Sequence, residues 1–297
     1  GHPYIDLRAS FNSFIPAKIN DNLANKLVEL YLNRLKKNKN LHDKIEFEVA
    51  ITCLTPNFNE LIKRFYKRSL KISEVKLLKE GLKLVTENII KSLDFNIKKV
   101  KELNKRYEKI KKSKKTSLDK TMLYISDCRE FGTLPFAHIA RAGFVAVSFL
   151  KSFVDKKAIS NEEFQLFMQS LNTVTTSFFN ESILLNKGKL SRKKLINTYG
   201  HLRPGTYDIC SPTYYSDPNY FFNILNTKNK VNIKKKNFKW KRESKLNICK
   251  LMESVGFNYS FNYLNNFLIN AIEASEYSKF LFTKNLSQAL EDIAVFG

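Results

Sequence analysis

The feature that most constrains this chain is the spacing of its apolar residues, which recur every three or four positions from about residue 57 onward. This period places apolar side chains on one face of an α-helix. Ser73 and Ser160 are expected to cap helices, because an acidic first turn follows each. The pattern predicts helices over 57–70, 73–112, 117–126, 135–155, 160–185, 191–199, 245–255 and 260–296.

The first 56 residues are expected to be more varied. Residues 4–16 mix apolar and polar side chains up to a proline, which suggests a strand or an extended entry. Asn20 and Asp21 should cap an amphipathic helix through about Lys36. Residues 44–52 alternate charged and apolar side chains, the period of a half-buried strand. The sequence therefore predicts an α+β fold, predominantly α-helical with a small β-sheet near the N-terminus.

The length of 297 residues and the 43% hydrophobic content indicate a globular protein with a sizeable core. Because no apolar run approaches about 18 residues and no signal-peptide pattern begins the chain, we expect a cytoplasmic protein without a membrane partner. The four cysteines are scattered without a CxxC pair, which favours reduced thiols over a zinc site.

The net charge of +23 would ordinarily suggest nucleic acid or an anionic surface as the partner. Here the excess of lysine pervades the whole chain, so nucleic acid is not the expected partner. The dense run over 98–115 continues a helical pattern and is expected to be a solvated face. The run over 228–245 lacks periodicity and is expected to be an exposed basic linker. A basic helical module that binds nucleic acid or another partner stays open as an alternative.

Residues 200–212 form a polar run with two glycines and two prolines, which exclude a regular helix. The run is either a binding loop for a small polar ligand or phosphoryl group, or an ordered connection whose polar groups satisfy one another. Its candidate site residues are His201, Arg203, Thr206, Tyr207, Asp208 and Ser211.

Two further groups of polar residues are candidates for ligand contacts. Arg8, Ser10 and Asn12 alternate in the expected extended run, where they would form a ligand wall or a solvent-facing strand edge. Arg129, His138 and Arg141 lie near the start of an apolar helix. There they suit either a buried arginine paired with a carboxylate or an anion site at the helix entrance. No GxxxxGK[ST], GxGxxG, HExxH or GxSxG motif occurs.

Four long, irregular segments of the chain are distinctive. They are Ile5-Asp6-Leu7-Arg8-Ala9-Ser10-Phe11-Asn12-Ser13-Phe14, Phe131-Gly132-Thr133 with His138 to Phe144, Tyr199-Gly200-His201-Leu202-Arg203-Pro204-Gly205-Thr206-Tyr207-Asp208, and Phe280-Leu281-Phe282-Thr283-Lys284-Asn285-Leu286-Ser287. Together these segments resemble the middle region of phosphoenolpyruvate-synthase-like phosphotransferases, and the resemblance spans nearly the whole chain. With its Lys/Asn-rich composition, the chain looks most like the L-glutamine kinases of Campylobacter capsular phosphoramidate biosynthesis.

The resemblance implies a division of labour between domains. In such enzymes an ATP-grasp domain passes the β-phosphoryl group of ATP to a histidine on a mobile domain, which carries it to an acceptor-binding domain. Residues 1–297 look like the acceptor-binding domain alone, which would be a piece of a larger enzyme that uses ATP and Mg²⁺. This piece is expected to be inactive by itself. The family's phosphohistidine follows a GGxTSH-type pattern. Phe136 and Ala137 stand where Thr-Ser is expected, so His138 is not assigned that role.

The implied reaction phosphorylates the side-chain amide nitrogen of L-glutamine. Arg8, Arg129, Arg141 and Arg203 are candidates to bind the carboxylate and the phosphoryl group. Asp208 or Glu130 would hold the ammonium, and His201 or Asp208 would orient the amide. We therefore expect catalytic roles for His201, Arg203 and Asp208 and no metal ligands. The expected substrate contacts are Arg8, Ser10, Asn12, Arg129, His138, Arg141, Thr206, Tyr207 and Ser211. A phosphoenolpyruvate synthase or another small-molecule dikinase is the alternative enzyme.

Overall fold

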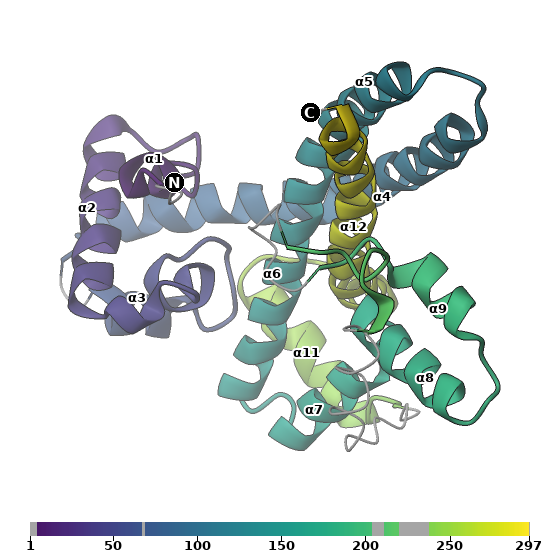
Figure 1. The fold of residues 1–297 in the computed structure, drawn as a ribbon. Coiled ribbons are helices and arrows are strands. Elements are labelled where there is room, and N and C mark those ends of the chain that lie inside the picture. The colour runs from purple at the N-terminus through teal and green to yellow at the C-terminus, as the bar shows by residue number, and fades with distance from the viewer. Residues whose placement is uncertain (1–4, 67–68, 204–210, 220–237, 297) are drawn as a thin grey trace. The chain divides into compact units, whose positions relative to one another are not determined.

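A computed structural model of the chain describes residues 5–66, 69–203, 211–219 and 238–296. All regular secondary structure in these four ranges is helical (Figure 1). The expected α+β fold with a small N-terminal sheet is therefore wrong, and the fold is all-α.

The chain divides into two compact units, and each unit is assembled from three separate segments. The first unit comprises Gly1–Ser92, Phe144–Gln165 and Lys239–Leu268. The second comprises Leu93–Gly143, Leu166–Phe238 and Ile269–Gly297. Both units therefore draw on early, middle and late parts of the chain. The expectation of one acceptor-binding domain over 1–297 stays a prediction.

The first unit begins with short helices and continues with parts of longer ones. Its helices α1 and α2 contact each other, and Figure 1 shows them with α3 in purple. Its elements are α1 (Leu7–Asn12), α2 (Asp21–Lys37), η1 (Lys39–Leu41), η2 (Ile45–Val49), α3 (Phe58–Tyr66), α11 (Arg242–Ser254) and the portions that it takes from α4 (Ile72–Lys112), α6 (Leu134–Asp155), α7 (Asn161–Ser170) and α12 (Phe261–Phe296).

Aromatic side chains fill the core of the first unit. The ring centroids of Phe11 and Tyr31 lie 5.6 Å apart, and those of Tyr31 and Tyr66 lie 6.0 Å apart. A second group of rings surrounds Phe149, which contacts Phe257 and Phe267 edge-on. Aromatic rings bury a large area at low entropic cost, so these contacts fix how α2, α3, α6 and α12 pack within the unit.

Both segments that were expected to be strands are instead helical turns. Asp6 begins α1 because its carboxylate accepts a hydrogen bond from the N–H of Ala9 at 3.0 Å. Residues Ile45–Val49 form a π-helical turn, closed by a bond from the N–H of Ala50 to the carbonyl of Ile45 at 2.9 Å. A short alternating run needs a partner strand to satisfy its backbone, and the described residues provide none.

Three predictions about helix ends can be compared with the structure. Asn20 does cap α2, since its side chain accepts from the N–H of Leu23 at 3.0 Å. Ser160 caps α7: its hydroxyl accepts from the N–H of Glu163, whose carboxylate accepts from the N–H of Ser160. Ser73 is not a cap, because α4 already includes it; the Glu74 carboxylate instead accepts from the N–H of Lys71.

The second unit packs its helices around the C-terminal half of α12. Figure 1 shows α8 and α9 as a green pair, and these two helices contact each other. The single helix predicted over 160–185 is two helices, because Thr173 caps a new helix by accepting from the N–H of Thr176. The elements of the unit are α5 (Ser117–Asp127), η3 (Cys128–Thr133), α8 (Val174–Asn186), α9 (Arg192–Tyr199) and its portions of α4, α6, α7 and α12.

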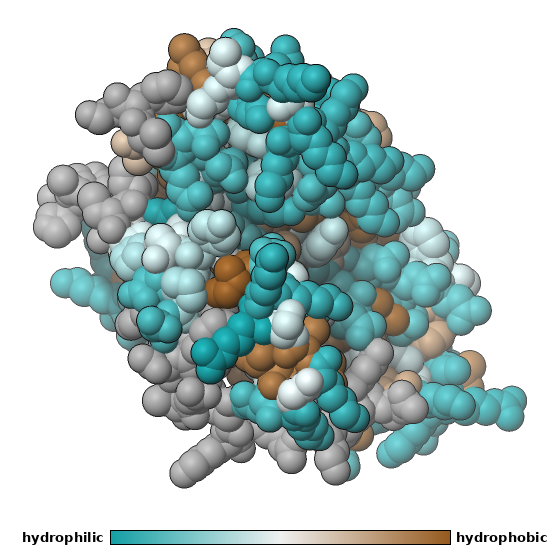
Figure 2. All heavy atoms as spheres, turned by 45° about the vertical axis from the view of Figure 1, so that its right-hand side comes forward, coloured by the Kyte–Doolittle hydropathy of each residue, from teal (hydrophilic) through white to brown (hydrophobic). Residues whose placement is uncertain are grey.

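The lysine-rich run over 98–115 lies mainly on the exposed face of α4, as predicted. Its buried face carries Val100, Leu103 and Tyr107, at the predicted spacing. Figure 2 shows hydrophilic side chains over much of the face that it displays, with hydrophobic side chains in smaller areas between them.

Within the second basic run, residues 228–237 lie outside the described residues, and Arg242–Lys245 begin α11 instead of forming a linker.

One continuous helical stretch, Ser117–Asp155, is long and apolar enough by composition to cross a membrane. Many of its apolar residues are core residues of their own units, including Ile139 and Ala142 in the second and Phe149 and Phe153 in the first. A buried core helix has the same length and composition, so this stretch is weak evidence for a membrane span.

Candidate functional site

The candidate site lies in the second unit, where the residues after α9 pack against α12. The N–H of Tyr215 donates to the carbonyl of Gly200, and the N–H of Tyr214 donates to the carbonyl of Leu202, both at 2.8 Å. These two bonds join the beginning of the predicted polar loop to the residues that follow it. They fix the backbone of His201 beside α12.

His201 is a largely buried, neutral side chain. Its ring meets the ring of Phe280 edge-on, with the centroids 4.6 Å apart. Burial, followed by the positive charge of Lys284, lowers the pKa of His201 to about 4. Its Nε2 atom is buried and has no hydrogen-bond partner in the described part of the chain. In this arrangement His201 supports the loop, and its Nε2 atom is shielded from solvent.

Arg203 and Lys284 bring two positive charges to one stripe of α12. The guanidinium of Arg203 donates to the hydroxyl of Ser287 at 3.0 Å, and this hydroxyl lies 3.4 Å from the carboxylate of Glu291. The ammonium of Lys284 lies 3.0 Å from the carboxylate of Glu108.

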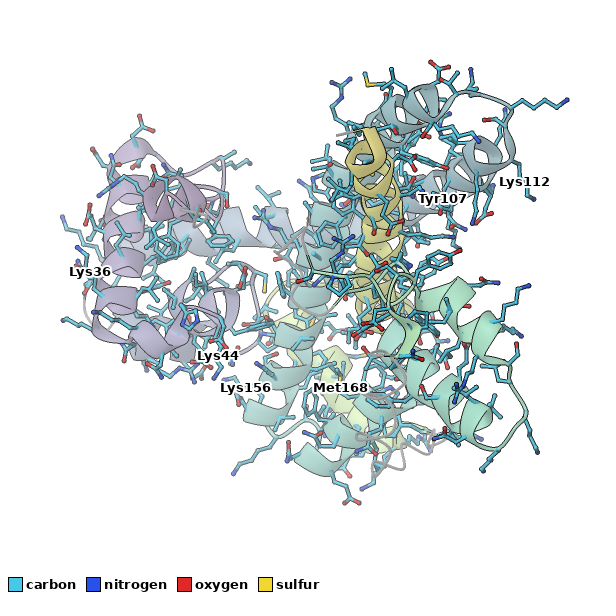
Figure 3. The ribbon with its side chains drawn as sticks, viewed as in Figure 1. Lys36, Lys44, Tyr107, Lys112, Lys156 and Met168 are labelled. Atoms are coloured by element: carbon cyan, nitrogen blue, oxygen red, sulfur yellow. The ribbon has the colours of Figure 1, made fainter. Side chains whose placement is uncertain are left out.

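The ring of Tyr107 covers the other side of the Lys284 ammonium, 4.3 Å from the ring centroid. Figure 3 labels this tyrosine, which extends from α4. Its hydroxyl lies 3.3 Å from Gln288 of α12. The salt bridge to Glu108 and the Tyr107 ring together hold the Lys284 ammonium in one place.

A pocket of about 350 Å³ adjoins this stripe within the second unit. Tyr199 and Phe280 line it, and the same Phe280 ring contacts His201, so the pocket and the loop share a wall. We call it the α8–α12 pocket. Its lining residues are Ile97, Lys101, Asn172, Val174, Ser177, Thr198, Tyr199, Asn270, Glu273, Ala274, Tyr277 and Phe280.

Two carboxylates of α12 hold the start of α8 at the rim of the α8–α12 pocket. Glu273 accepts from the N–H of Asn172 at 2.6 Å, and Glu276 accepts from the N–H of Thr175 at 3.0 Å. N–H groups at the start of a helix lack partners within the helix, so these two bonds fix the N-terminal end of α8. Glu273 therefore has a defined position in the pocket wall.

Tyr199 is a hydrogen-bond donor at neutral pH. Burial, followed by the negative charge of Glu181, raises the pKa of its hydroxyl to about 12. Its ring lies edge-on to Phe178 and Phe280, with centroid distances of 5.0 Å and 5.8 Å. The tyrosine that precedes the polar loop is thus a rigid part of the pocket wall.

The segment around Gly132 packs against the same helix. A Cβ atom on Gly132 would lie 2.7 Å from the Phe282 ring, so only glycine fits there without a shift. Phe136 stacks on Phe282 at a centroid distance of 5.8 Å. Three of the four segments that carry the family resemblance therefore meet α12 in the second unit or belong to it.

The structure separates the remaining predicted site residues. Arg129 and His138 are exposed and Arg141 is half-buried, so the predicted buried arginine is not Arg129. The buried carboxylate nearby is that of Asp127, which pairs at 2.8 Å with the partly exposed Arg106. Ser211 is half-buried, whereas Thr206, Tyr207 and Asp208 lie outside the described residues.

The three candidates on α1 belong to the first unit. Arg8 forms an ion pair with Glu29, and the Ser10 hydroxyl donates to the carbonyl of Asp6 at 2.9 Å. Asn12 is exposed at the last residue of the helix. The expectation that they share one strand face is wrong, because residues two positions apart lie on the same face of a strand but not of a helix.

Lys101, Asn172, Asn270 and Glu273 line the pocket but were missed in the sequence. They come from three distant parts of the chain and match no motif.

In the described residues, no group of three His, Cys, Asp or Glu side chains is placed to hold a metal ion. No protein-family model, curated protein or solved structure matches the chain.

Proposed function

We propose that this chain is the acceptor-binding part of an ATP-dependent phosphotransferase, and that L-glutamine is its acceptor. The observation that carries the proposal is the α8–α12 pocket, because its wall residue Tyr199 directly precedes the polar loop and its wall residue Phe280 contacts His201 of that loop. The family resemblance favours the same assignment, because Tyr199 to Asp208 and Phe280 to Ser287 are two of its four segments.

The lining of the pocket suits a free amino acid with an amide side chain. Lys101 offers a cation for the α-carboxylate, and Glu273 offers a carboxylate for the ammonium. Asn172 and Asn270 each carry an amide, which can both donate to and accept from a glutamine side chain. A volume of about 350 Å³ lies at the lower end of the range for ligand pockets, which suits a molecule of this size.

Arg203 and Lys284 supply the positive charge that a phosphoryl acceptor site needs. Phosphoryl transfer depends mainly on positioning and on cations near the equatorial oxygens. Under this proposal the two cations stabilise the incoming group, while His201 keeps the loop against α12. The phosphohistidine, ATP and Mg²⁺ would belong to other domains of the same polypeptide, and the product would serve capsular phosphoramidate synthesis.

Calorimetric titration with L-glutamine tests the proposal. We expect binding that is selective over L-glutamate and pyruvate and that falls at least tenfold in Lys101→Met and in Glu273→Gln. Lys105→Met is the matched control, since Lys105 is an exposed residue of the same helix that does not line the pocket. Binding of pyruvate but not glutamine, with no effect of Glu273→Gln, would favour the alternative dikinase. No binding of either compound would contradict an acceptor site here.

A further inference from the structure

A second pocket, of about 240 Å³, lies wholly within the first unit. We call it the Asn57 pocket. It lies between η2, the segment that leads into α3, and the end of α6. Its lining residues are Phe47, Glu48, Thr55, Asn57, Leu61, Arg64, Ser148, Lys151, Val154, Asp155, Asn161 and Phe164.

The Asn57 pocket contains a fixed chain of polar side chains. The Thr55 hydroxyl donates to the Asn57 side-chain oxygen, and the Asn57 amide nitrogen donates to the Asp155 carboxylate, both at 2.7 Å. Thr55 and Asn57 are only 2% and 6% exposed. Burying a polar group costs free energy unless the group is hydrogen-bonded, so these three connected side chains have a defined geometry.

Asn57 directs its side chain toward Asp155 although it immediately precedes α3. At that position an asparagine oxygen commonly accepts from the first N–H groups of the helix. Here the oxygen instead accepts from Thr55. The bond to Asp155 uses one of two N–H donors of Asn57 and one of two carboxylate oxygens of Asp155, and the other groups can serve a ligand.

The positive and negative side chains that line the pocket are equal in number, and only some of them form salt bridges with one another. Arg64 lies 3.4 Å from Glu48, which is a loose contact. Lys151 lies over the Phe47 ring, 4.2 Å from its centroid, and forms no salt bridge within the described residues. Lys156, five residues along, instead pairs with Glu60 at 2.6 Å; Figure 3 labels this lysine, which directly follows the last residue of α6.

We propose that the Asn57 pocket is a binding site for a zwitterionic molecule of the α-amino-acid class. Lys151 would bind the carboxylate, to which the free N–H of Asn57 can also donate, and Asp155 would bind the ammonium. The ring of Phe47 and the apolar residues Leu61, Val154 and Phe164 would receive the side chain. Two cations and two carboxylates line the pocket, so a ligand without net charge but with separated charges matches it best.

This proposal is independent of the proposed function, because the two pockets share no residue. It is tested in the Lys101→Met/Glu273→Gln double variant of the full chain, in which the α8–α12 pocket is disabled. The probes are the twenty protein amino acids, each at 10 mM in a thermal-shift assay. Each amino acid that raises the melting temperature is then titrated calorimetrically.

We expect at least one amino acid to bind the double variant. Adding Lys151→Met or Asp155→Asn should weaken its binding at least tenfold. Lys250→Met and Glu253→Gln are matched controls and should leave it unchanged, since both residues are exposed on α11 and outside the pocket. Acetate and ethylamine, which each carry one of the two charges, should bind at least tenfold more weakly than the amino acid.

Three results would overturn the proposal: no amino acid binds the double variant, binding survives both pocket substitutions, or acetate alone binds as tightly as the amino acid. Circular dichroism of each variant checks that it is folded. Failure of the proposed function gives a different pattern. Glutamine affinity would then be unaffected by Lys101→Met and Glu273→Gln, whatever happens at Lys151 and Asp155.

Discussion

The rings of His201 and Phe280 meet edge-on, with the centroids 4.6 Å apart. This contact predicts that acid destabilises the folded chain through His201. The unfolded histidine has a pKa of 6.5 and the folded one about 4, so between these values only the unfolded chain binds the proton. The free energy of unfolding should fall by up to about 3 kcal/mol as the pH drops from about 6.5 to about 4.

Urea unfolding of the wild type and of His201→Gln between pH 7 and pH 4 measures this loss. We expect a smaller loss in the variant, because its side chain takes up no proton. His138→Gln is the control, as His138 is exposed, and should behave like the wild type. If the free energy of unfolding fell equally in His201→Gln and in the wild type, folding would not lower the pKa of His201.

Gly132→Ala should destabilise the chain by about 1–3 kcal/mol, because the added methyl group would overlap the Phe282 ring. Thermal and urea unfolding measure the effect. Phe282→Leu should remove much of this cost, so the double variant is expected to be more stable than the sum of the two single effects. Strictly additive effects would mean that the two residues are not in contact.

Glu163→Ala should cost about 1–3 kcal/mol, since Glu163 joins two elements of the first unit. Its carboxylate accepts from the N–H of Ser160 and from the hydroxyl of Ser244 at 2.8 Å, and the residue is buried. The adjacent residue Glu162 is exposed, so Glu162→Ala should change the free energy of unfolding by less than about 0.5 kcal/mol. Chemical denaturation compares the two, and equal effects would contradict a bridging role for Glu163.

Binding to duplex DNA should be weak, with a Kd no tighter than the non-specific range of about 10⁻⁶ M at physiological salt. Fluorescence anisotropy at two salt concentrations measures it. An acceptor site instead predicts that Arg203→Ala reduces activity of the full-length enzyme. Nanomolar DNA binding that weakens steeply with salt and survives Arg203→Ala would support the basic interaction module.

Helices with long apolar stripes were predictable from the sequence. Those over 73–112, 117–126, 135–155, 191–199 and 260–296 lie within one residue of α4, α5, α6, α9 and α12 at each end. The short alternating runs were not predictable, because five to nine residues fit a strand and a helical turn equally well. Phe47 illustrates this: its alternation suggested a strand, yet its position reflects packing on Phe144 at 5.5 Å.

The candidate site was predictable only where its residues are neighbours in the sequence. The polar run at 200–212 identified His201 and Arg203, and both lie beside α12. Lys101 and Glu273 were not predictable, because the fold alone brings them to one pocket. A lysine on a lysine-rich helix carries no local signal that separates it from its solvated neighbours.

The interleaving of the two units also determines when each can form during synthesis. The first unit includes residues up to Leu268 and the second continues beyond it, so neither has all its partners until residues of α12 have left the ribosome. Until then, apolar faces of α4 and α6 await α12. A chain arrested before α12 would expose them, and such nascent chains should depend on chaperones more than those of a protein whose domains follow one another in sequence.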